Sequence, residues 1–358
     1  MRAILAGGGT GGHVIPALAI ARELRDRYHA DITFIGTSRG LETRLVPAAG
    51  FKLELVEVGQ LKNVSLATRA HTMLALPRAL WRASSIVREF RPHVVIGVGG
   101  YASGPGMLAA ALSAVPTLAF EPNYVAGLAN RLVAPMLSAA AVQFPETART
   151  FRNAVITGIP VRPEFFAIPP RPPNAPPTLL VFGGSQGAKA INRAVIEALP
   201  GLRERVPGIH VVHQTGERDY HESQAAYLHS GISAELHAFI DDMPAMFARA
   251  DLIVCRSGAS TVAEIAAAGK PAIFIPFPRA ADDHQLRNAE ALARDHAAVV
   301  IPENRLTREL LVDTVASLLN DRARLSAIGV AARVHAHPGA AAYIASVAAK
   351  LAGVSLRA

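Results

Sequence analysis

The histidine at position 13 ends the heptapeptide GGGTGGH (residues 7–13), in which five glycines surround one threonine. A neutral imidazole, with an unperturbed pKa near 6.5, can accept a proton from a hydroxyl group. A glycine loop between a strand and a helix presents backbone N–H groups and a helix N-terminus to an anion, usually a phosphate. The heptapeptide therefore predicts a general base, His13, beside an anion site. The alternative is that His13 only orients the loop or caps the helix.

The same glycines fit a dinucleotide fingerprint only in part. Gly7, Gly9 and Gly12 match the spacing G-x-G-x-x-G. That fingerprint also needs an acidic residue at the end of the second strand, to bind a ribose hydroxyl. Here the segment DITFIG ends in Gly36 and is followed by Thr37. The missing carboxylate disfavours a nicotinamide cofactor.

Two further segments predict anion sites. After the apolar run ADLIVC, residues 257–261 (SGAST) open a helix with hydroxyl groups and N–H groups at its start. Glu264 follows on the first turn or so, where a carboxylate can accept two ribose hydroxyls or simply favour the helix dipole. The third glycine loop, GVGGYASGPG (residues 97–106), predicts several backbone contacts to one extended anion. Structural turns are the alternative there, since turns favour the same residue types.

The elements that must hold these residues come in two similar sets. RAILA (residues 2–6) predicts a strand, and Pro16 fits the first turn of a helix with apolar residues at helical spacing. The segment 178–199 repeats the order of strand, glycine turn and helix. Apolar runs without alternation are typical of parallel strands covered on both faces. We therefore predict an α/β protein with two doubly wound domains that face each other across a cleft and bind ligands at the strand ends.

Composition limits the function further. The chain has 358 residues, 51% of them hydrophobic, which favours two domains with large cores. A single cysteine, Cys255, excludes an internal disulfide and fits a reducing compartment. No apolar stretch reaches the roughly 20 residues of a membrane span, and the N-terminus lacks the apolar core of a signal peptide.

Residues 1–160 hold 16 Lys and Arg against 9 Asp and Glu, a net charge of +7. This basic half suits an anionic surface or large anionic substrate, whereas no basic run, zinc spacing or RNP-like motif indicates nucleic acid.

Between Pro160 and Pro177 there are eight prolines, which predict a semi-rigid linker without helix. No D-x-D motif appears. The acidic pairs 241–242 and 282–283 are predicted to be solvated or capping, so no metal or other cofactor is expected.

Five segments in this order resemble the bacterial MurG family: GGGTGGHVIPALAIA, GVGGYASGPG, GGSQGA, FIDDM and RSGASTVAEIAAAGKPAIFIPF. The resemblance implies the GT-B architecture of two Rossmann-like domains. It also implies inverting transfer of N-acetylglucosamine from its UDP conjugate to undecaprenyl-linked lipid I, giving lipid II. The place implied is peripheral, at the cytoplasmic face of the bacterial inner membrane. Alternatives are another GT-B glycolipid synthase using a UDP-sugar, or a non-catalytic regulator that binds a nucleotide sugar.

The resemblance also implies roles for individual residues. Ile240 would present backbone groups to uracil, Glu264 would bind the ribose hydroxyls, and Asn123 and Gln285 would contact the sugar. The whole donor set that it implies is Thr10, Gly11, Gly12, Asn123, Arg162, Ser185, Ile240, Ala259, Ser260, Thr261, Val262, Ala263, Glu264 and Gln285. The acceptor-side set is Gly9, Gly99, Gly100, Tyr101, Ser103 and Gly104. The family usually reads E-Q-N where this chain has Glu121, Pro122 and Asn123, which predicts a stiffer local backbone.

Each half is predicted to have its own task. Residues 1–160 would hold the acceptor and associate with the membrane, with a C-terminal helix at about 341–358 packing back on them. Residues 161–340 would bind the donor, after a linker at about 160–177.

In the segment HTMLALPRALWRASSIVREFR (residues 71–91) apolar residues lie among arginines, which favours binding to an anionic membrane surface. An ordinary amphipathic core helix is the alternative. The residues concerned are Met73, Leu74, Leu76, Leu80 and Trp81, with Arg69, Arg78, Arg82, Arg88 and Arg91.

Overall fold

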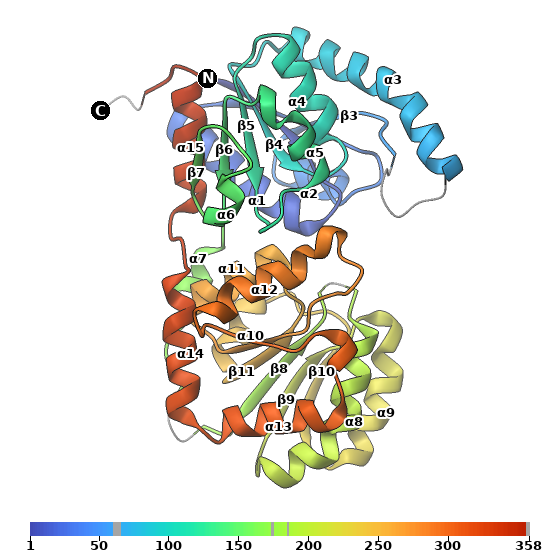
Figure 1. Cartoon of the computed structure of the whole chain (residues 1–358), viewed down its shortest axis with the longest axis vertical. Helices are drawn as coiled ribbons and strands as arrows, with labels where there is room; N and C mark the ends of the chain where they lie inside the picture. Colours follow the sequence, from blue (N-terminus) through green and yellow to red (C-terminus); the bar gives the residue numbers. More distant parts are fainter. Residues whose placement is uncertain (60–65, 173–174, 185, 356–358) are drawn as a thin grey trace. The chain divides into compact units, whose positions relative to one another are not determined.

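The protein consists of two compact units in a computed structural model that describes residues 1–59, 66–172, 175–184 and 186–355, with the backbone alone for 66–74. The N-terminal unit comprises Met1–Pro160 and Gly339–Ala358, and the C-terminal unit comprises Val161–Pro338 (Figure 1). Among the described residues, no helix has the length and apolar character needed to span a bilayer.

The N-terminal unit is built on a seven-stranded parallel sheet with the order β3-β2-β1-β4-β5-β6-β7. Its strands are β1 (Arg2–Gly7), β2 (Asp31–Gly36), β3 (Lys52–Leu55), β4 (Val94–Gly99), β5 (Thr117–Glu121), β6 (Ala139–Val142) and β7 (Ala154–Ile156). Its helices are α1 (Gly11–Tyr28), α2 (Glu42–Ala48), α3 (Leu66–Phe90), α4 (Ser103–Leu112), α5 (Leu128–Val133), the 3₁₀ turn η1 (Ala134–Met136), α6 (Pro145–Ala148) and α15 (Ala340–Leu351). Helices α3, α4 and α5 pack together, and α15 contacts α1 and β4 (Figure 1). The fully buried centre of β1, for example Ile4, explains why its apolar run does not alternate.

The C-terminal unit repeats this plan with a six-stranded parallel sheet in the order β10-β9-β8-β11-β12-β13. Its strands are β8 (Thr178–Phe182), β9 (His210–Gln214), β10 (Ser233–His237), β11 (Leu252–Cys255), β12 (Ala272–Phe274) and β13 (Val299–Val300). Its α-helices are α7 (Pro163–Phe166), α8 (Lys189–Arg205), α9 (Tyr220–Ser230), α10 (Met243–Arg249), α11 (Ala259–Ala268), α12 (His284–Arg294), α13 (Arg308–Leu319) and α14 (Arg322–Val334). Its 3₁₀ turns are η2 (Glu217–Asp219), η3 (Ala281–Asp283) and η4 (Glu303–Arg305).

The strand order reverses at one place in each sheet. In the N-terminal unit this switch lies between β1 and β4, and in the C-terminal unit between β8 and β11. Loops that leave neighbouring strands there in opposite directions open a crevice at the carboxyl ends of the strands, where open α/β sheets bind ligands. The glycine loops of the sequence follow these four strands.

Two local predictions were wrong. Helix α1 begins at Gly11, inside the glycine loop, so Pro16 lies in its second turn rather than its first. The proline-rich segment contains a short helix, α7, because Pro163 can occupy the first helical position, where no N–H is needed. Phe165 of this helix is fully buried and meets the ring of Phe247 edge-on, with centroids 5.0 Å apart. This contact anchors the start of the segment to the C-terminal unit.

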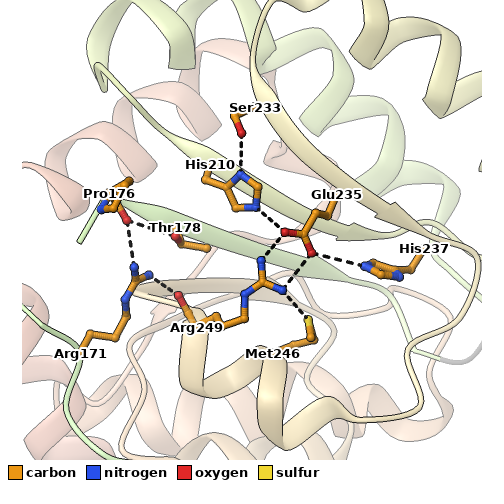
Figure 2. Close-up of polar contacts among 9 residues, drawn as sticks. All are labelled: Arg171, Pro176, Thr178, His210, Ser233, Glu235, His237, Met246 and Arg249. Carbon is orange, nitrogen blue, oxygen red and sulfur yellow. Dashed lines mark hydrogen bonds and ion pairs between the residues drawn. The ribbon is translucent and has the colours of Figure 1, made fainter.

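A polar cluster connects the edge strand β10 with β9 and α10 (Figure 2). His210 pairs with Ser233 Oγ through Nδ1 at 2.8 Å and with Glu235 Oε1 through Nε2 at 3.2 Å. Glu235 also accepts two hydrogen bonds from Arg249, and these hold the pKa of its carboxyl below the usual value, although burial opposes them. Nearby, Arg171 donates to the carbonyl of Pro176 at 3.1 Å, which fixes the end of the proline-rich segment.

Candidate functional site

The two glycine loops at the switch point of the N-terminal unit interlock. The N–H of Gly8 donates to the carbonyl of Gly99 at 3.1 Å. A Cβ on Gly7 would lie 2.1 Å from that same carbonyl oxygen, and a Cβ on Gly100 would lie 2.3 Å from the carbonyl oxygen of Gly8. Any side chain at these positions would push the loops apart, so several glycines serve contact between the loops rather than contact with a ligand.

Glu42 is a buried carboxylate that sequence reasoning missed. It is 1% exposed at the start of α2, and it accepts hydrogen bonds from the N–H of Gly9 at 2.7 Å and from the N–H and Oγ1 of Thr37, both at 2.9 Å. Burial raises the pKa of this carboxyl, but the hydrogen bonds outweigh burial and the net shift is downward. Because Glu42 takes the N–H of Gly9, that group is unavailable to an acceptor phosphate, against expectation. The signal in the sequence was the pair Gly36 and Gly40, where a Cβ would lie within 2.6 and 1.9 Å of this side chain.

Replacing Glu42 with alanine should destabilise the protein by about 1.5–3 kcal/mol, the usual worth of a hydrogen bond to a charged group. The change leaves the part-buried N–H groups of Gly9 and Thr37 without their acceptor. Urea unfolding at pH 7.5 measures the loss in the free energy of unfolding. The control is Glu57→Ala, at an exposed residue of the same unit. Since the pKa of Glu42 is lowered in the folded state, its contribution is present above the unfolded value of 4.5 and is lost as the pH falls below it. Equal midpoints for Glu42→Ala and wild type would refute this role.

His13 lies at the third position of α1 with its ring oriented by the glycine loop. Its Nδ1 is 3.2 Å from the carbonyl oxygen of Gly8 and 3.4 Å from Thr10 Oγ1. A carbonyl oxygen only accepts, so the neutral ring carries its proton on Nδ1, and Nε2 holds the lone pair. A Cβ on Gly99 would be 2.9 Å from Nε2, so only glycine there leaves room for the ring. The first N–H groups of α1, at Gly11 and Gly12, have no partner within the helix and form the positive end of its dipole.

The loops after β4 and β5 supply the remaining predicted residues of the N-terminal unit. Ser103 begins α4, is 1% exposed, and has no hydrogen-bond partner for its Oγ. Tyr101 just before it is 42% exposed. Glu121 is 3% exposed and accepts from the N–H and Nδ2 of Asn123, both at 3.1 Å, and from Gly127 at 2.8 Å. This carboxylate therefore holds its loop and turns the Nδ2 end of the Asn123 amide toward itself.

In the C-terminal unit, the start of α11 carries the predicted nucleotide groups. The helix begins at Ala259, directly after β11, and the buried Ser260 Oγ has no hydrogen-bond partner there. Glu264 lies half-buried on the second turn, and no hydrogen bond reaches its carboxylate among the described residues. Burial raises the pKa of Glu264 to about 7, and the positive charge of Arg162 opposes this shift. A carboxylate held this way has both oxygens available for hydroxyl groups.

Gln285 is oriented by the neighbouring loop. Its Oε1 accepts from the N–H of Phe277 at 3.0 Å, so its Nε2 end is left to donate. Ser257 Oγ donates to the carbonyl of Gln285 at 2.8 Å, which ties this loop to the end of β11. Arg256 donates to the carbonyls of residues 275 and 276 and lies over the ring of Phe277 at 5.4 Å. The amide of Gln285 is thus set as a donor for a hydroxyl acceptor.

A buried polar network joins the end of β9 to α8 and α9. Asn192 donates from Nδ2 to the carbonyl of Thr215 and to Asp219, both at 2.8 Å, so its Oδ1 accepts from Nε2 of His213 at 3.1 Å. Nδ1 of His213 then accepts from the hydroxyl of Tyr227 at 3.0 Å. Burial lowers the pKa of His213 to about 3, so this ring is neutral in the folded protein.

His213 should therefore make stability depend on pH. The folded pKa lies below the unfolded value of 6.5, so its contribution is complete above that pH and is lost as the pH falls from there toward 3. The expected slope is about 1.4 kcal/mol per pH unit. Urea unfolding between pH 7 and pH 4.5 should give a shallower slope for His213→Gln than for wild type, whatever the absolute stability of the variant. His221→Gln, at an exposed histidine of α9, should keep the wild-type slope. A parallel slope for His213→Gln would contradict the expectation.

Comparison with known proteins places the chain in a family. Residues 3–142 match the N-terminal domain model of glycosyltransferase family 28, and residues 178–342 match its C-terminal domain model. A protein of Solibacter usitatus named UDP-N-acetylglucosamine–N-acetylmuramyl-(pentapeptide) pyrophosphoryl-undecaprenol N-acetylglucosamine transferase is 46% identical over 96% of this chain and 94% of its own. A protein of the same name from Syntrophotalea carbinolica is 43% identical over 99% of both chains. The crystal structure of Acinetobacter baumannii MurG matches with a TM-score of 0.83 and 32% identity, over 98% of this chain and 99% of that one.

The chain belongs to the MurG family.

Membership in the MurG family confirms the predicted fold and enzyme class: the protein is a glycosyltransferase with GT-B architecture, made of two Rossmann-like parallel-sheet domains. The glycosyltransferase of kitacinnamycin, with a TM-score of 0.71 at 18% identity, shares this fold.

In each unit of this MurG-family enzyme, the predicted residues other than Arg162 lie in the loops and helix starts that follow the carboxyl ends of the strands. The N-terminal unit holds residues 9–13, 99–104 and 123, and the C-terminal unit holds 162, 240, 259–264 and 285. Ser185 lies outside the described residues. The N–H of Ile240 already donates to Gln214 Oε1 at 2.9 Å, which sequence reasoning did not foresee. Among the described residues, no three His, Cys, Asp or Glu side chains gather where a metal ion could be held.

Proposed function

We propose that this enzyme transfers N-acetylglucosamine from UDP-N-acetylglucosamine to the muramyl sugar of undecaprenyl-pyrophosphoryl-MurNAc-pentapeptide (lipid I), with inversion, forming lipid II. The observation that carries the proposal is Glu264, a carboxylate without a hydrogen-bond partner among the described residues, one turn from the open N-terminus of α11. A ribose diol and a diphosphate, joined as in UDP, need these two groups side by side. The names of the relatives support the same donor and acceptor.

The donor would be bound mainly by the C-terminal unit. Glu264 accepts the two ribose hydroxyls, and the N–H groups at residues 259–261 with Ser260 Oγ bind the diphosphate. Arg162, on the same unit, adds positive charge near the nucleotide. The Nε2 group of Gln285 donates to a sugar hydroxyl, and the carbonyl of Ile240 remains for the N3–H of uracil. The resemblance implies more than one backbone contact between Ile240 and uracil. Because the N–H of Ile240 already donates to Gln214, uracil would have one such contact unless Ile240 releases Gln214.

The chemistry would draw on the N-terminal unit. His13 accepts the proton of the acceptor hydroxyl through Nε2 as the oxygen attacks the anomeric carbon and UDP leaves. The start of α1 at Thr10, Gly11 and Gly12 and the start of α4, with Ser103 Oγ unpaired, offer N–H groups to the diphosphates. Asn123, held by Glu121, would contact the transferred sugar. Helix dipoles and N–H donors would stabilise the charge that develops on UDP.

A transfer assay with purified protein tests the proposal. UDP-N-acetylglucosamine labelled in the sugar should yield labelled lipid II and one UDP per transfer, and only with lipid I present. Transfer to a different lipid and not to lipid I would identify another glycolipid synthase. Tight binding of UDP with no transfer to any acceptor would identify a regulator, and binding of NAD in place of UDP would refute the donor assignment.

The membrane surface belongs to the same proposal, since the acceptor is a lipid. On α3, Trp81 is 65% exposed, and the exposed Arg78 and Arg88 lie on the same helix. An exposed indole among cations is suited to the interface of an anionic bilayer. Leu80, by contrast, packs against the core of the N-terminal unit, so it is unsuitable as an anchor or as a test position. Met73 and Leu74 fall among the residues whose side chains the structure leaves undescribed.

Replacing Trp81 with glutamate should reduce binding to vesicles that contain anionic lipid by about tenfold, because an apolar anchor is replaced with a negative charge. Sedimentation with vesicles at low salt measures it. Binding by the wild type should weaken as salt rises. Leu228→Glu, at a side chain 80% exposed on α9 of the C-terminal unit, should bind like wild type. Absence of wild-type binding at low salt would rule out this surface.

A further inference from the structure

Gln214 joins two loops of the C-terminal unit through the two ends of one side-chain amide. It is the last residue of β9 and is 1% exposed. Its Nε2 donates to the carbonyl of Gly184, in the loop after β8, at 2.8 Å. Its Oε1 accepts from the N–H of Ile240, in the loop after β10, at 2.9 Å. The donor end and the acceptor end each meet their complement, so the amide has one favourable orientation.

The residues beside Gln214 keep its position fixed. His213 is held between Tyr227 and Asn192 in the buried network described above. On the other side, the N–H of Thr215 donates to the carbonyl of His237 at 2.9 Å. A Cβ on Gly187 would lie 1.9 Å from the carbonyl oxygen of Thr215, so the end of β9 presses directly on the loop after β8. The backbone at Gln214 is therefore held in place from both sides, and the amide of Gln214 sets the spacing of the two loops.

These two loops would contact opposite ends of the donor nucleotide. In the proposed function, on which this inference rests, residue 240 meets uracil and the start of α11 meets the diphosphate. Because β8 pairs with β11, the glycine loop after β8 leaves the sheet beside the start of α11, where it would meet the same diphosphate. We infer that Gln214 is a positioning residue for the nucleotide, which holds the uracil loop and the diphosphate loop at the separation that UDP requires. Loops ordered before binding cost less conformational entropy when both ends of the ligand engage. Gln214 itself touches neither end.

The separate ligands uridine and UDP test this role, because uridine engages one loop and UDP engages both. Gln214→Leu removes both hydrogen bonds and keeps an apolar side chain of similar reach. We expect calorimetry to show UDP affinity lower by about 10- to 100-fold and uridine affinity lower by a smaller factor. In turnover, KM for UDP-N-acetylglucosamine should rise with kcat nearly unchanged. Gln224→Leu, at an exposed glutamine on α9, is the matched control.

Gln214→Glu separates the two loops and remains informative if the leucine variant does not fold. Its carboxylate can still accept from the N–H of Ile240, but it places a second acceptor against the carbonyl of Gly184. Uridine affinity should stay near wild type while UDP affinity falls. Equal losses for uridine and UDP in the variants, or no loss in either, would overturn the positioning role. Failure of the wild-type protein to bind UDP would instead overturn the proposed function.

Discussion

Replacing His13 with alanine is expected to lower kcat by about 10²–10⁴-fold while UDP affinity stays within a few fold, because general-base assistance typically contributes that much. The ring stands at the start of α1 with Nδ1 against the carbonyl of Gly8, so Nε2 is the nitrogen that can take a proton. The nucleotide groups lie in the other unit, which is why donor binding should survive the change.

The variant His13→Asn separates chemistry from loop structure. Asparagine keeps a polar side chain at the start of α1 but offers no base between pH 5 and 9. A basic group that acts in the free enzyme should give wild-type kcat/KM a limb that rises with pH, and the asparagine variant should lose that limb if the group is His13. Near-normal turnover by His13→Asn would make His13 structural. Glu121 is then a poor substitute, because its carboxylate already accepts hydrogen bonds from Asn123 and Gly127. Melting temperatures of both variants show whether fold is retained.

Replacing Glu264 with alanine is expected to weaken UDP binding by about 1.5–3 kcal/mol, or roughly 10- to 150-fold, the range for hydrogen bonds to a charged group. The carboxylate stands half-buried beside the start of α11 and has no hydrogen bond within the described part of the chain, so the ribose hydroxyls would be its partners. Calorimetric titration with UDP measures the change. Glu222→Ala, at an exposed residue of α9, should leave the affinity unaltered. An unchanged affinity for Glu264→Ala would remove this residue from the site.

Glu264 also predicts how donor binding depends on pH. Burial raises its pKa to about 7, so at pH 6 most free protein carries a protonated carboxyl, and binding through the carboxylate must first release that proton. Wild-type affinity for UDP should therefore increase from pH 6 to pH 8. The diphosphate of UDP titrates in the same range, so the informative quantity is the difference between wild type and Glu264→Gln. If both proteins show the same pH dependence, the carboxyl of Glu264 does not take part.

The sequence alone was sufficient for features that depend on neighbours along the chain. Glycine-rich turns between an apolar run and a helical pattern identified the strand-to-helix loops before α1, α4, α8 and α11, because such turns combine residues without a Cβ and helix N-termini in a few positions. Unbroken apolar runs identified parallel strands, and the order of the motifs identified the family. The start of α1 was placed five residues late, since a proline signal says where a helix can begin and not where the surrounding loop is already helical.

The tertiary structure decided which groups these loops still have available for a ligand. Glu42 reaches back 33 residues to the N–H of Gly9, and Gln214 reaches 30 residues to Gly184 and 26 to Ile240. No local spacing predicts such pairs, because strands distant in sequence come together only when the sheet forms in the order 3-2-1-4. A buried carboxylate or amide must then find partners among whichever loops the sheet edge brings near it. Sequence therefore showed where the N–H groups of the glycine loops occur. Only packing determined that the N–H groups of Gly8 and Gly9, and that of Ile240 in the loop after β10, already bind within their own units.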